Sequence, residues 1–252
     1  MAKLKWHETG EKYYETGIKD VVLFVYNDEA TASDNSDYED GVAWNGVTAL
    51  SETPSGGEAS DLYADDDKYL SLYSEEQLGA SIEAYTYPDE WGACDGSVTV
   101  GDGLELKQQT RKMFGLAYIT TVGNDVDGND KGEKLHLLYG CKASPSDRSY
   151  ATINDSPEAI TFSWELTTTK QEVPEGYKKT CLITVDTTKL TGGKDNATYK
   201  QLKAMVQGVD ADSTADPAVV DAAPYLPRAK AVIEMFAVAD ADSTAEPAAG
   251  ND

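Results

Sequence analysis

The sequence predicts an all-β, mainly antiparallel fold, a β-sandwich or barrel with one short helix. The clearest sign is a strict two-residue period within residues 158–169. Its apolar members are Ile160, Phe162, Trp164 and Leu166. This period places one face of a strand against a core and the other face in water. Further short apolar runs separated by turn residues, with few helical patterns, are typical of a sandwich or barrel.

Eight strands are predicted from such runs. In chain order they span residues 21–26, 41–50, 68–72, 78–87, 112–122, 134–141, 159–169 and 178–186. Turn-forming residues separate them, notably at 124–130 and at 174–176. Within the sixth strand, His136 lies on the face opposite Leu135, Leu137 and Tyr139, which indicates a structural role for this histidine.

One short helix is predicted immediately after Pro88. Proline suits the first turn of a helix, and the helix dipole favours the acidic Asp89 and Glu90 there. Gly96 lies beyond the expected end.

The predicted strand 112–122 is apolar on both faces. Phe114, Leu116 and Tyr118 alternate with Met113, Ala117 and Ile119. A strand of this kind is covered twice, once by its own core and once by something else. The pattern leaves two interpretations open: a neighbouring subunit covers the second face, or the strand is central and buried between a sheet and a helix.

The composition changes after Leu190, so we predict a β domain at residues 1–190 and a small helical and flexible extension at 191–252. Helical patterns span 197–207, closed by Gly208, and 227–237. The segment DADSTADPA at 210–218 recurs as DADSTAEPA at 240–248. These small polar segments cannot bury a core, so they are predicted to be flexible loops or a disordered tail, with the helices between them lying on the outside of the domain.

The chain of 252 residues has a net charge of -24 and is long enough to bury a core. Residues 28–67 contain no Lys or Arg. This acidity is explained either by a solvated surface or by useful repulsion of a polyanion such as DNA. The sequence shows neither a signal peptide nor a membrane span, so we expect a protein that stays in the cytoplasm where it is made.

The three cysteines, Cys94, Cys141 and Cys181, lack CxxC spacing and are predicted to be small buried residues in a reducing compartment. Residues 92–96 (GACDG) match the spacing of a nucleophile elbow around Cys94. That elbow requires a parallel-sheet strand and an adjacent histidine, whereas the chain holds only His7 and His136. We therefore predict no catalytic site, no cofactor and no enzymatic activity.

Asp125, Asp127 and Asn129 have the one-three-five spacing of a calcium loop. The pattern fails where Asp130 replaces the glycine and His136 replaces the bidentate glutamate. A hairpin turn explains the segment without a metal, so these three residues are only weak metal candidates.

Several separate segments agree, in order, with one family. They are GVAWNGVTAL (41–50), EAYTYPDEWGACDGS (83–97), QQTRKMFGLAY (108–118), KLHLLYG (134–140) and YATINDSPEAITFSWE (150–165). In this order they closely resemble the major tail protein, or tail-tube protein, of long-tailed siphophages that infect Gram-positive bacteria. The resemblance runs from KLKWHETGEKYYETG near the start to Asp186 and returns at APYLPRAKAVIEMF (223–236).

The resemblance implies a structural virion protein whose six-membered rings stack into a hollow, acidic tail tube. DNA passes through the lumen during ejection without specific binding, and no membrane is involved. The implied partners are further copies of the chain, a tape-measure protein, a tail-tip initiator and a tail terminator. The N-terminal arm and the 124–130 hairpin are our candidates for contacts between rings. The resemblance also favours a neighbouring subunit as the cover for the second face of the 112–122 strand.

The alternative is a β-sandwich module for carbohydrate binding or surface adhesion. Fifteen tyrosines and four tryptophans are available to line a sugar-binding face. However, Trp164 lies on the core-like stripe, and such a module normally has a secretion signal or wall anchor. The oligomeric state separates the two functions.

Overall fold

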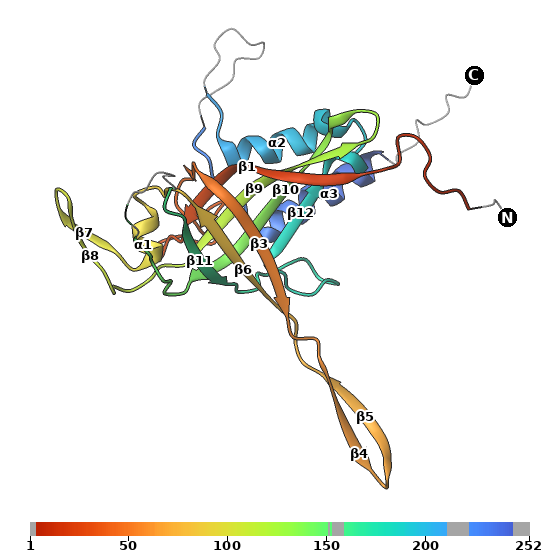
Figure 1. The fold of residues 1–252 in the computed structure, drawn as a ribbon. Helices are drawn as coiled ribbons and strands as arrows, with labels where there is room; N and C mark the ends of the chain where they lie inside the picture. The colour runs from red at the N-terminus through yellow and green to blue at the C-terminus, as the bar shows by residue number, and fades with distance from the viewer. Residues whose placement is uncertain (1–3, 151, 153–158, 211–221, 244–252) are drawn as a thin grey trace.

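The computed structural model describes residues 4–150, 152, 159–210 and 222–243. It confirms the all-β, mainly antiparallel fold (Figure 1). The described strands are β1 (Tyr14–Val25), β2 (Val42–Ala43), β3 (Val47–Ser55), β4 (Ala59–Ala64), β5 (Asp67–Tyr73), β6 (Gln77–Ala84), β7 (Val98–Gly101), β8 (Leu104–Leu106), β9 (Phe114–Asn124), β10 (Gly128–Ala143), β11 (Phe162–Thr167) and β12 (Leu182–Asp186). The α-helices are α1 (Trp91–Asp95), α2 (Ala197–Gln207) and α3 (Ala229–Ser243).

One eight-stranded sheet folds over on itself to form the two layers of the body. Its order is β2-β1-β9-β10-β11-β6-β3, and β12 also pairs with β10. Strand β10 joins the layers, because Lys134–Leu138 pair with β9 and β12 whereas Lys142 and Ala143 pair with β11. Two further sheets are separate hairpins, β4–β5 and β7–β8.

The first hydrophobic core fills the space between the two layers. Its centre is an aromatic cluster in which Trp91 lies 4.5 Å from Trp44, 5.2 Å from Trp164 and 4.9 Å from Phe114, between ring centroids. The predicted stripe on β11 is confirmed for Trp164 and Leu166, which are buried, whereas Phe162 is half-buried and Ile160 is exposed. Aromatic side chains of this size account for much of the apolar area that the fold buries.

A second core lies between the β1–β9–β10–β12 layer and the helices α2 and α3. Ala117 and Ile119 of β9 pack there with Leu202 of α2 and Val232 of α3. Helices of the same chain therefore cover the second face of the 112–122 strand. The interpretation of a central strand between sheet and helix is confirmed, and coverage by a neighbouring subunit is wrong for this strand.

Each of the eight predicted strands overlaps an observed strand, but several details differ. The predicted strand 41–50 is broken into β2 and β3, because Gly46 adopts a φ of +79° between them. Strands β4, β7 and β8 were not predicted. Helix α1 follows Pro88 as predicted, and Gly96 ends it in the left-handed conformation with a φ of +75°. The helix begins only at Trp91, so Pro88, Asp89 and Glu90 precede it and its first turn holds no acidic residue, which corrects that part of the prediction.

Helix α2 matches the predicted span 197–207 and begins at the cap Asn196, whose side chain accepts a hydrogen bond from the Tyr199 N–H. Helix α3 is longer than predicted. It continues through Ser243 and so includes the first residues of the second repeat, which corrects the expectation of a loop or tail at 240–243. The remainder of that repeat, and residues 211–218 of the first, lie outside the described residues. The division of the chain at residue 190 stays a prediction.

None of the described helices has the length and apolar character needed to cross a membrane.

Candidate functional site

The most unusual feature of the molecule is the β4–β5 hairpin, which projects from the body as a continuation of β3 and β6 (Figure 1). Its two-residue loop is Asp65-Asp66, and both residues have positive φ, 53° and 64°. This is the backbone of a type I′ turn, which matches the twist of a hairpin and favours residues such as Asp. The sequence therefore specifies the hairpin locally, without help from a core.

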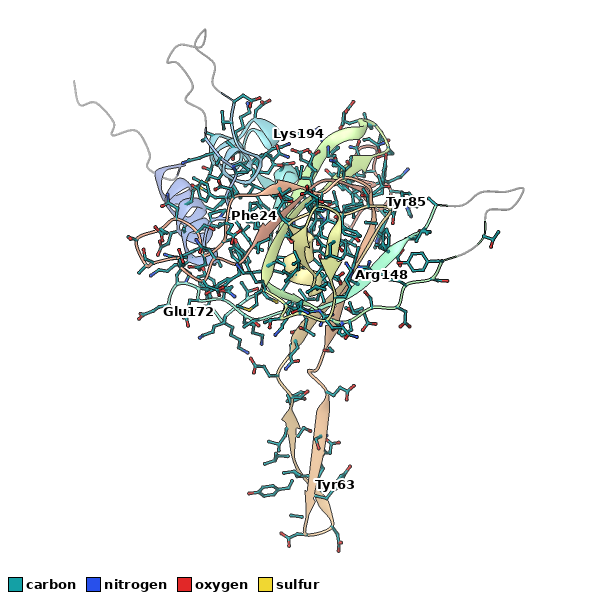
Figure 2. The ribbon with its side chains drawn as sticks, turned by 90° about the vertical axis from the view of Figure 1, so that its left-hand side faces the viewer. Phe24, Tyr63, Tyr85, Arg148, Glu172 and Lys194 are labelled. Atoms are coloured by element: carbon teal, nitrogen blue, oxygen red, sulfur yellow. The ribbon has the colours of Figure 1, made fainter. Side chains whose placement is uncertain are left out.

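The hairpin exposes apolar side chains on both faces. Leu62, Leu70 and Leu72 share one face, because the register pairs Leu62 with Leu70 and Ser60 with Leu72. Tyr69 and Tyr73 lie on the opposite face, at 72% and 74% exposure. Figure 2 shows Tyr63 pointing away from the ribbon, far from the body.

The smaller β7–β8 hairpin exposes apolar side chains on one face. The register pairs Val98 with Leu106 and places Val100 and Leu104 on the same face, while Thr99 pairs with Glu105 on the other. All four apolar side chains are exposed, from 47% to 60%. An amphipathic ribbon whose apolar face is uncovered is typical of a surface that binds another protein.

Isolated two-stranded hairpins are only marginally stable in water. The large side chains of β4–β5 stay exposed in the single chain, so they add little to its stability beyond cross-strand pairs such as Leu62 with Leu70. Together the two hairpins form the candidate functional site, which we call the assembly hairpins. Their chemistry is that of protein–protein contact through leucine, valine and tyrosine side chains.

The long strand β3 is a second exposed feature, at the edge of the sheet. It lies at one end of the sheet order, and the other end is the two-residue β2. An exposed edge presents unpaired N–H and C=O groups that accept a strand from another chain. The same ribbon thus carries both an open edge and the projecting hairpin.

The N-terminal arm and the 124–130 hairpin contact each other. The Asp125 carboxylate accepts hydrogen bonds from the Gly10 N–H at 3.0 Å and the Lys12 N–H at 3.4 Å. Asn124 donates to the Gly10 carbonyl, and Tyr14 Oη donates to Asn129 Oδ1 at 2.9 Å. These two candidates for ring contacts therefore form one surface at the end of β9 and β10.

The weak metal candidates Asp125, Asp127 and Asn129 have protein partners. Asp125 and Asn129 hold the arm, and Asp127 pairs with Lys131 Nζ at 3.3 Å. Within the described part of the chain, no group of three or more His, Cys, Asp or Glu residues is arranged to hold a metal ion. The hairpin contacts explain these polar residues as structural.

The elbow-like segment around Cys94 folds as α1 inside the first core. Cys94 is fully buried, and burial raises the pKa of its thiol to about 12. Such a thiol stays protonated at neutral pH, and the thiolate is the nucleophilic form. Cys141 and Cys181 are buried as well, so the prediction of small buried cysteines is confirmed.

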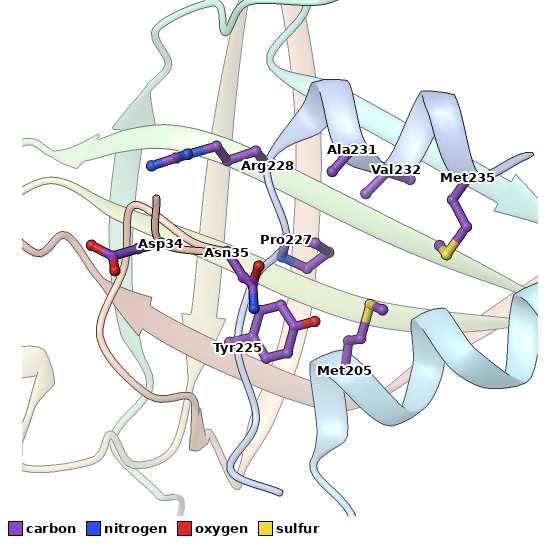
Figure 3. Close-up of a pocket in the computed structure, with 9 residues that line it drawn as sticks. All are labelled: Asp34, Asn35, Met205, Tyr225, Pro227, Arg228, Ala231, Val232 and Met235. Carbon is purple, nitrogen blue, oxygen red and sulfur yellow. The ribbon is translucent and has the colours of Figure 1, made fainter. Parts of the chain in front are cut away.

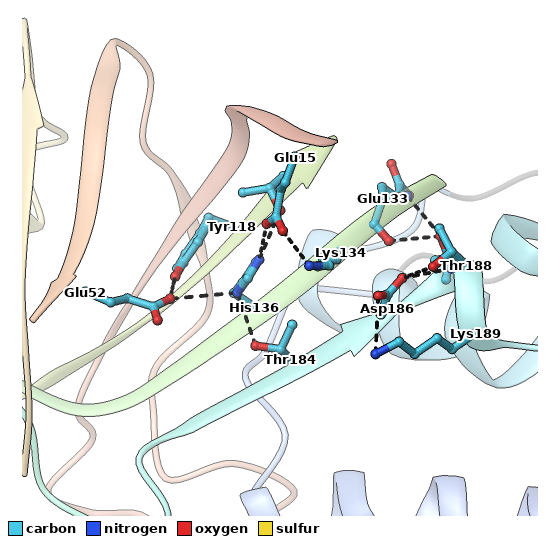
Figure 4. Close-up of polar contacts among 12 residues, drawn as sticks. Glu15, Glu52, Tyr118, Glu133, Lys134, His136, Thr184, Asp186, Thr188 and Lys189 are labelled. Atoms are coloured by element: carbon cyan, nitrogen blue, oxygen red, sulfur yellow. Dashed lines mark hydrogen bonds and ion pairs between the residues drawn. The ribbon is translucent and has the colours of Figure 1, made fainter. Parts of the chain in front are cut away.

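His136 lies in a polar cluster between the layers (Figure 4). Thr120 Oγ1 is 3.0 Å from Nε2, and Thr184 Oγ1 is 3.2 Å from Nδ1, while the Tyr118 ring stacks on the imidazole at 4.6 Å. Burial lowers the pKa of His136, although Glu52 and Glu15 oppose this shift. The two threonines fix the ring, in agreement with the predicted structural role.

Glu133 of β10 attaches helix α2 to the sheet. Its carboxylate accepts hydrogen bonds from Tyr199 Oη at 2.7 Å and Lys203 Nζ at 2.6 Å, and Lys19 Nζ lies 3.3 Å away. Burial raises the pKa of this carboxyl, but the bonds from Lys203 and Tyr199 outweigh burial and bring the pKa to about 2. Its backbone exchanges hydrogen bonds with the Thr187 hydroxyl.

A cavity of about 240 Å³ separates helices α2 and α3 (Figure 3). Met205 and Met235 face it from the two helices, and Arg228 lies at its rim. The Arg228 guanidinium is already engaged by Asp37 and by the carbonyls of Thr31 and Ala32. Asp34, Asn35 and Tyr225 also line the cavity, so its wall is partly apolar and partly polar.

The sequence does contain a signal for the assembly hairpins that the strand prediction missed. In SDLYADDDKYLSLY the two acidic turn residues separate two runs of similar length, and in VTVGDGLEL a Gly-Asp-Gly turn separates Val98 and Val100 from Leu104 and Leu106. These are the turn residues expected of hairpins. Nothing in either run indicates that its apolar face stays uncovered.

No protein-family model matches this chain. No curated protein matches it either. Among solved structures, the chain is similar to a chain of "Cryo-EM structure of the anti-feeding prophage (AFP) baseplate, 6-fold symmetrised", with 12% identity and a TM-score of 0.31. The match covers 74% of this chain and all of that chain. A similarity at this TM-score supports no conclusion about fold or function.

Proposed function

We propose that this chain is a structural virion protein, the subunit of a phage tail tube. Its hexameric rings stack into a hollow acidic conduit through which DNA is ejected. The observation that carries the proposal is the pair of assembly hairpins, whose exposed apolar side chains need a partner chain. The segments that resemble tail-tube proteins, in the same order along the chain, favour a tail tube as that assembly.

The open edge of β3 supports ring formation. Head-to-tail contacts with rotational closure give a ring, and ring faces that are not self-complementary continue stacking into a tube. Pairing of β3 with a neighbouring copy would also remove an edge that otherwise promotes aggregation. The β4–β5 hairpin reaches far enough from the body to contact a second copy (Figure 1).

The remaining parts of the proposal follow from the same role. The partners are further copies of the chain, a tape-measure protein, a tail-tip initiator and a terminator, and the mature location is the virion tail. The protein is not an enzyme in this proposal. The buried Cys94 thiol and the His136 held between two threonines support that view.

Negative-stain electron microscopy of the purified full-length chain, with light-scattering mass on the same samples, tests the proposal. We expect six-membered rings or hollow tubes as concentration and salt increase. A chain that stays monomeric under all these conditions, and also after the tail-tip initiator is added, would contradict it.

One observation favours the alternative, a carbohydrate-binding or adhesion module. Tyr63, Tyr69 and Tyr73 are exposed on a projecting ribbon, and aromatic rings of this kind stack on sugars. This function expects a monomer that is retained on a polysaccharide column and released by the variant Tyr69→Ala/Tyr73→Ala. Tubes without polysaccharide retention would exclude it.

A further inference from the structure

The β3–β6–β11 layer has one face that is not buried in the first core. Register places three rows across it: Ala49, Glu83 and Ser163; then Ser51, Ser81 and Glu165; then Thr53, Gly79 and Thr167. The residues between them, including Ala80, Ile82, Trp164 and Leu166, point into the core. We call the nine outward residues the smooth face.

No described helix covers the smooth face. Helices α2 and α3 pack on the other layer, against β9 and β10. Figure 1 shows β3 and β6 on the side of the body away from these helices. Ser51, Thr53, Glu83, Ser163, Glu165 and Thr167 are all exposed.

The chemistry of the smooth face differs from that of a binding surface. Seven of its side chains are Ser, Thr, Ala or Gly, two are carboxylates, and none is Lys or Arg. The first cation in register is Lys142 of β10, which pairs with Thr167 at the border. None of the nine is a large aromatic or aliphatic anchor of the kind that concentrates binding energy at protein interfaces. One exposed aromatic residue, Tyr85, follows Glu83 just past the end of β6, at the border of the face.

Duplex DNA is held by Lys and Arg, which neutralise phosphates and release counterions. A surface without these cations forms no such contacts, and Glu83 and Glu165 repel phosphates. The other seven side chains are short, so only the two repelling carboxylates project from the sheet. The smooth face therefore has the properties of a wall past which a polyanion moves.

We propose that the smooth face lines the conduit and faces duplex DNA in transit; this inference rests on the proposed tail-tube function. The assembly hairpins and the β3 edge then make the contacts between copies. The helices α2 and α3, on the opposite side of the body, lie on the outside of the tube.

Cysteine labelling of assembled tubes tests this placement. The variant Ser163→Cys puts one thiol on the smooth face, and Gln201→Cys puts one on the exposed side of α2. The three native cysteines are buried and give little background in the folded chain. Each variant is treated with a small maleimide and with a maleimide on a polymer too large to enter the tube, before and after assembly.

We expect both thiols to react with both reagents before assembly. After assembly, the thiol of Ser163→Cys should lose reaction with the large reagent and keep reaction with the small one, while that of Gln201→Cys keeps both. Continued reaction of the Ser163→Cys tubes with the large reagent would place the smooth face outside. Loss of both reactions would place it in a subunit interface, which equally overturns the inference.

A second measurement uses a short linear DNA duplex. Tubes of Ser81→Lys/Ser163→Lys should retain duplex that is protected from nuclease, whereas wild-type tubes should retain none. The matched variant Ala197→Lys/Gln201→Lys gains the same charge on α2. DNA bound to its tubes should remain open to nuclease digestion. If nuclease digests the DNA on tubes of the smooth-face variant, the inference is overturned while the tubes themselves uphold the proposed function. If the wild-type chain forms no tubes, even after the tail-tip initiator is added, both are overturned.

Discussion

Trp164 of β11 and Tyr63 of β4 are both aromatic residues on antiparallel strands of one chain. Trp164 is 1% exposed, at the centre of the first core, whereas Tyr63 is 71% exposed on the projecting hairpin. The apolar residues of the body are buried and stabilise its fold, whereas those of the hairpin are exposed. The comparison separates residues that fold the chain from residues that we assign to assembly.

The largest expected effect is on the body. Trp164→Ala should lower the free energy of unfolding by about 3–5 kcal/mol, because it leaves a cavity among Trp44, Tyr87 and Trp91. Chemical denaturation of the unassembled chain at low salt measures the change. Tyr63→Ala is the matched aromatic control and should change the same quantity by less than about 0.5 kcal/mol. Equal losses in the two variants would break the distinction between body and hairpin.

The second effect is at the bend of β10 where the chain passes between layers. Gly140 has a φ of +60°, and an added Cβ would lie 2.5 Å from the Thr169 carbonyl oxygen. Gly140→Ala should cost roughly 1–2 kcal/mol for the left-handed backbone and about 1–3 kcal/mol more for the clash. Gly57→Ala, with a φ of +72° but open space, should show only the first cost. Thermal melts compare the pair, and similar losses would mean that the clash is relieved.

A third, smaller effect concerns the attachment of α2 to the body. Glu133→Gln should lower stability at pH 7 by roughly 1.5–3 kcal/mol, because charged hydrogen bonds from Tyr199 and Lys203 are weakened. Glu172→Gln removes an exposed pair with Lys179 and should have almost no effect. Denaturation at pH 7 measures both.

The lowered pKa of Glu133 predicts that stability depends on pH. The folded-state pKa of Glu133 is lowered from 4.5 to about 2, so the unfolded chain binds more protons in this range and stability falls as the pH falls from about 4.5 to about 2. The stability difference between wild type and Glu133→Gln should therefore shrink over this window. A constant difference down to pH 2 would show that the charge of Glu133 is not responsible.

The smallest expected effect on folding comes from the hairpin itself. Leu70→Ser/Leu72→Ser should change the stability of the unassembled chain by less than about 0.5 kcal/mol, since both side chains are already exposed. Assembly should nevertheless require at least about tenfold more protein, because each lost anchor of this kind costs more than about 1 kcal/mol at an interface. Sedimentation of tubes across protein concentration measures it. If tubes form at the same protein concentration as wild type, β4–β5 does not contribute to the contacts between copies.

The salt concentration should affect assembly and the stability of the body differently, and this test needs no mutation. With a net charge of -24, copies repel one another at low ionic strength, and salt screens this repulsion. We expect tube formation to increase with salt, while the stability of the unassembled body changes little. Light scattering follows assembly, and tubes that dissolve as salt rises would contradict the prediction.

Local patterns were sufficient for much of the body. The alternation around Trp164 predicted β11, and Pro88 with Gly96 predicted α1, because both depend on residues close in sequence. The same patterns did not predict that the apolar faces of the assembly hairpins are exposed. Turn residues and alternation are visible in VTVGDGLEL, but the exposure of Val98 and Leu104 depends on the absence of a covering layer.

The sequence by itself determined that the chain forms antiparallel strands with acidic turns and two C-terminal helices, since strand and helix periods are local properties. Only the tertiary structure decided which apolar faces are covered. It placed α2 and α3 over the second face of β9 and left β4–β5 uncovered. Coverage depends on contacts between distant segments, and an apolar stripe has the same local pattern whether its partner belongs to the same chain or to another.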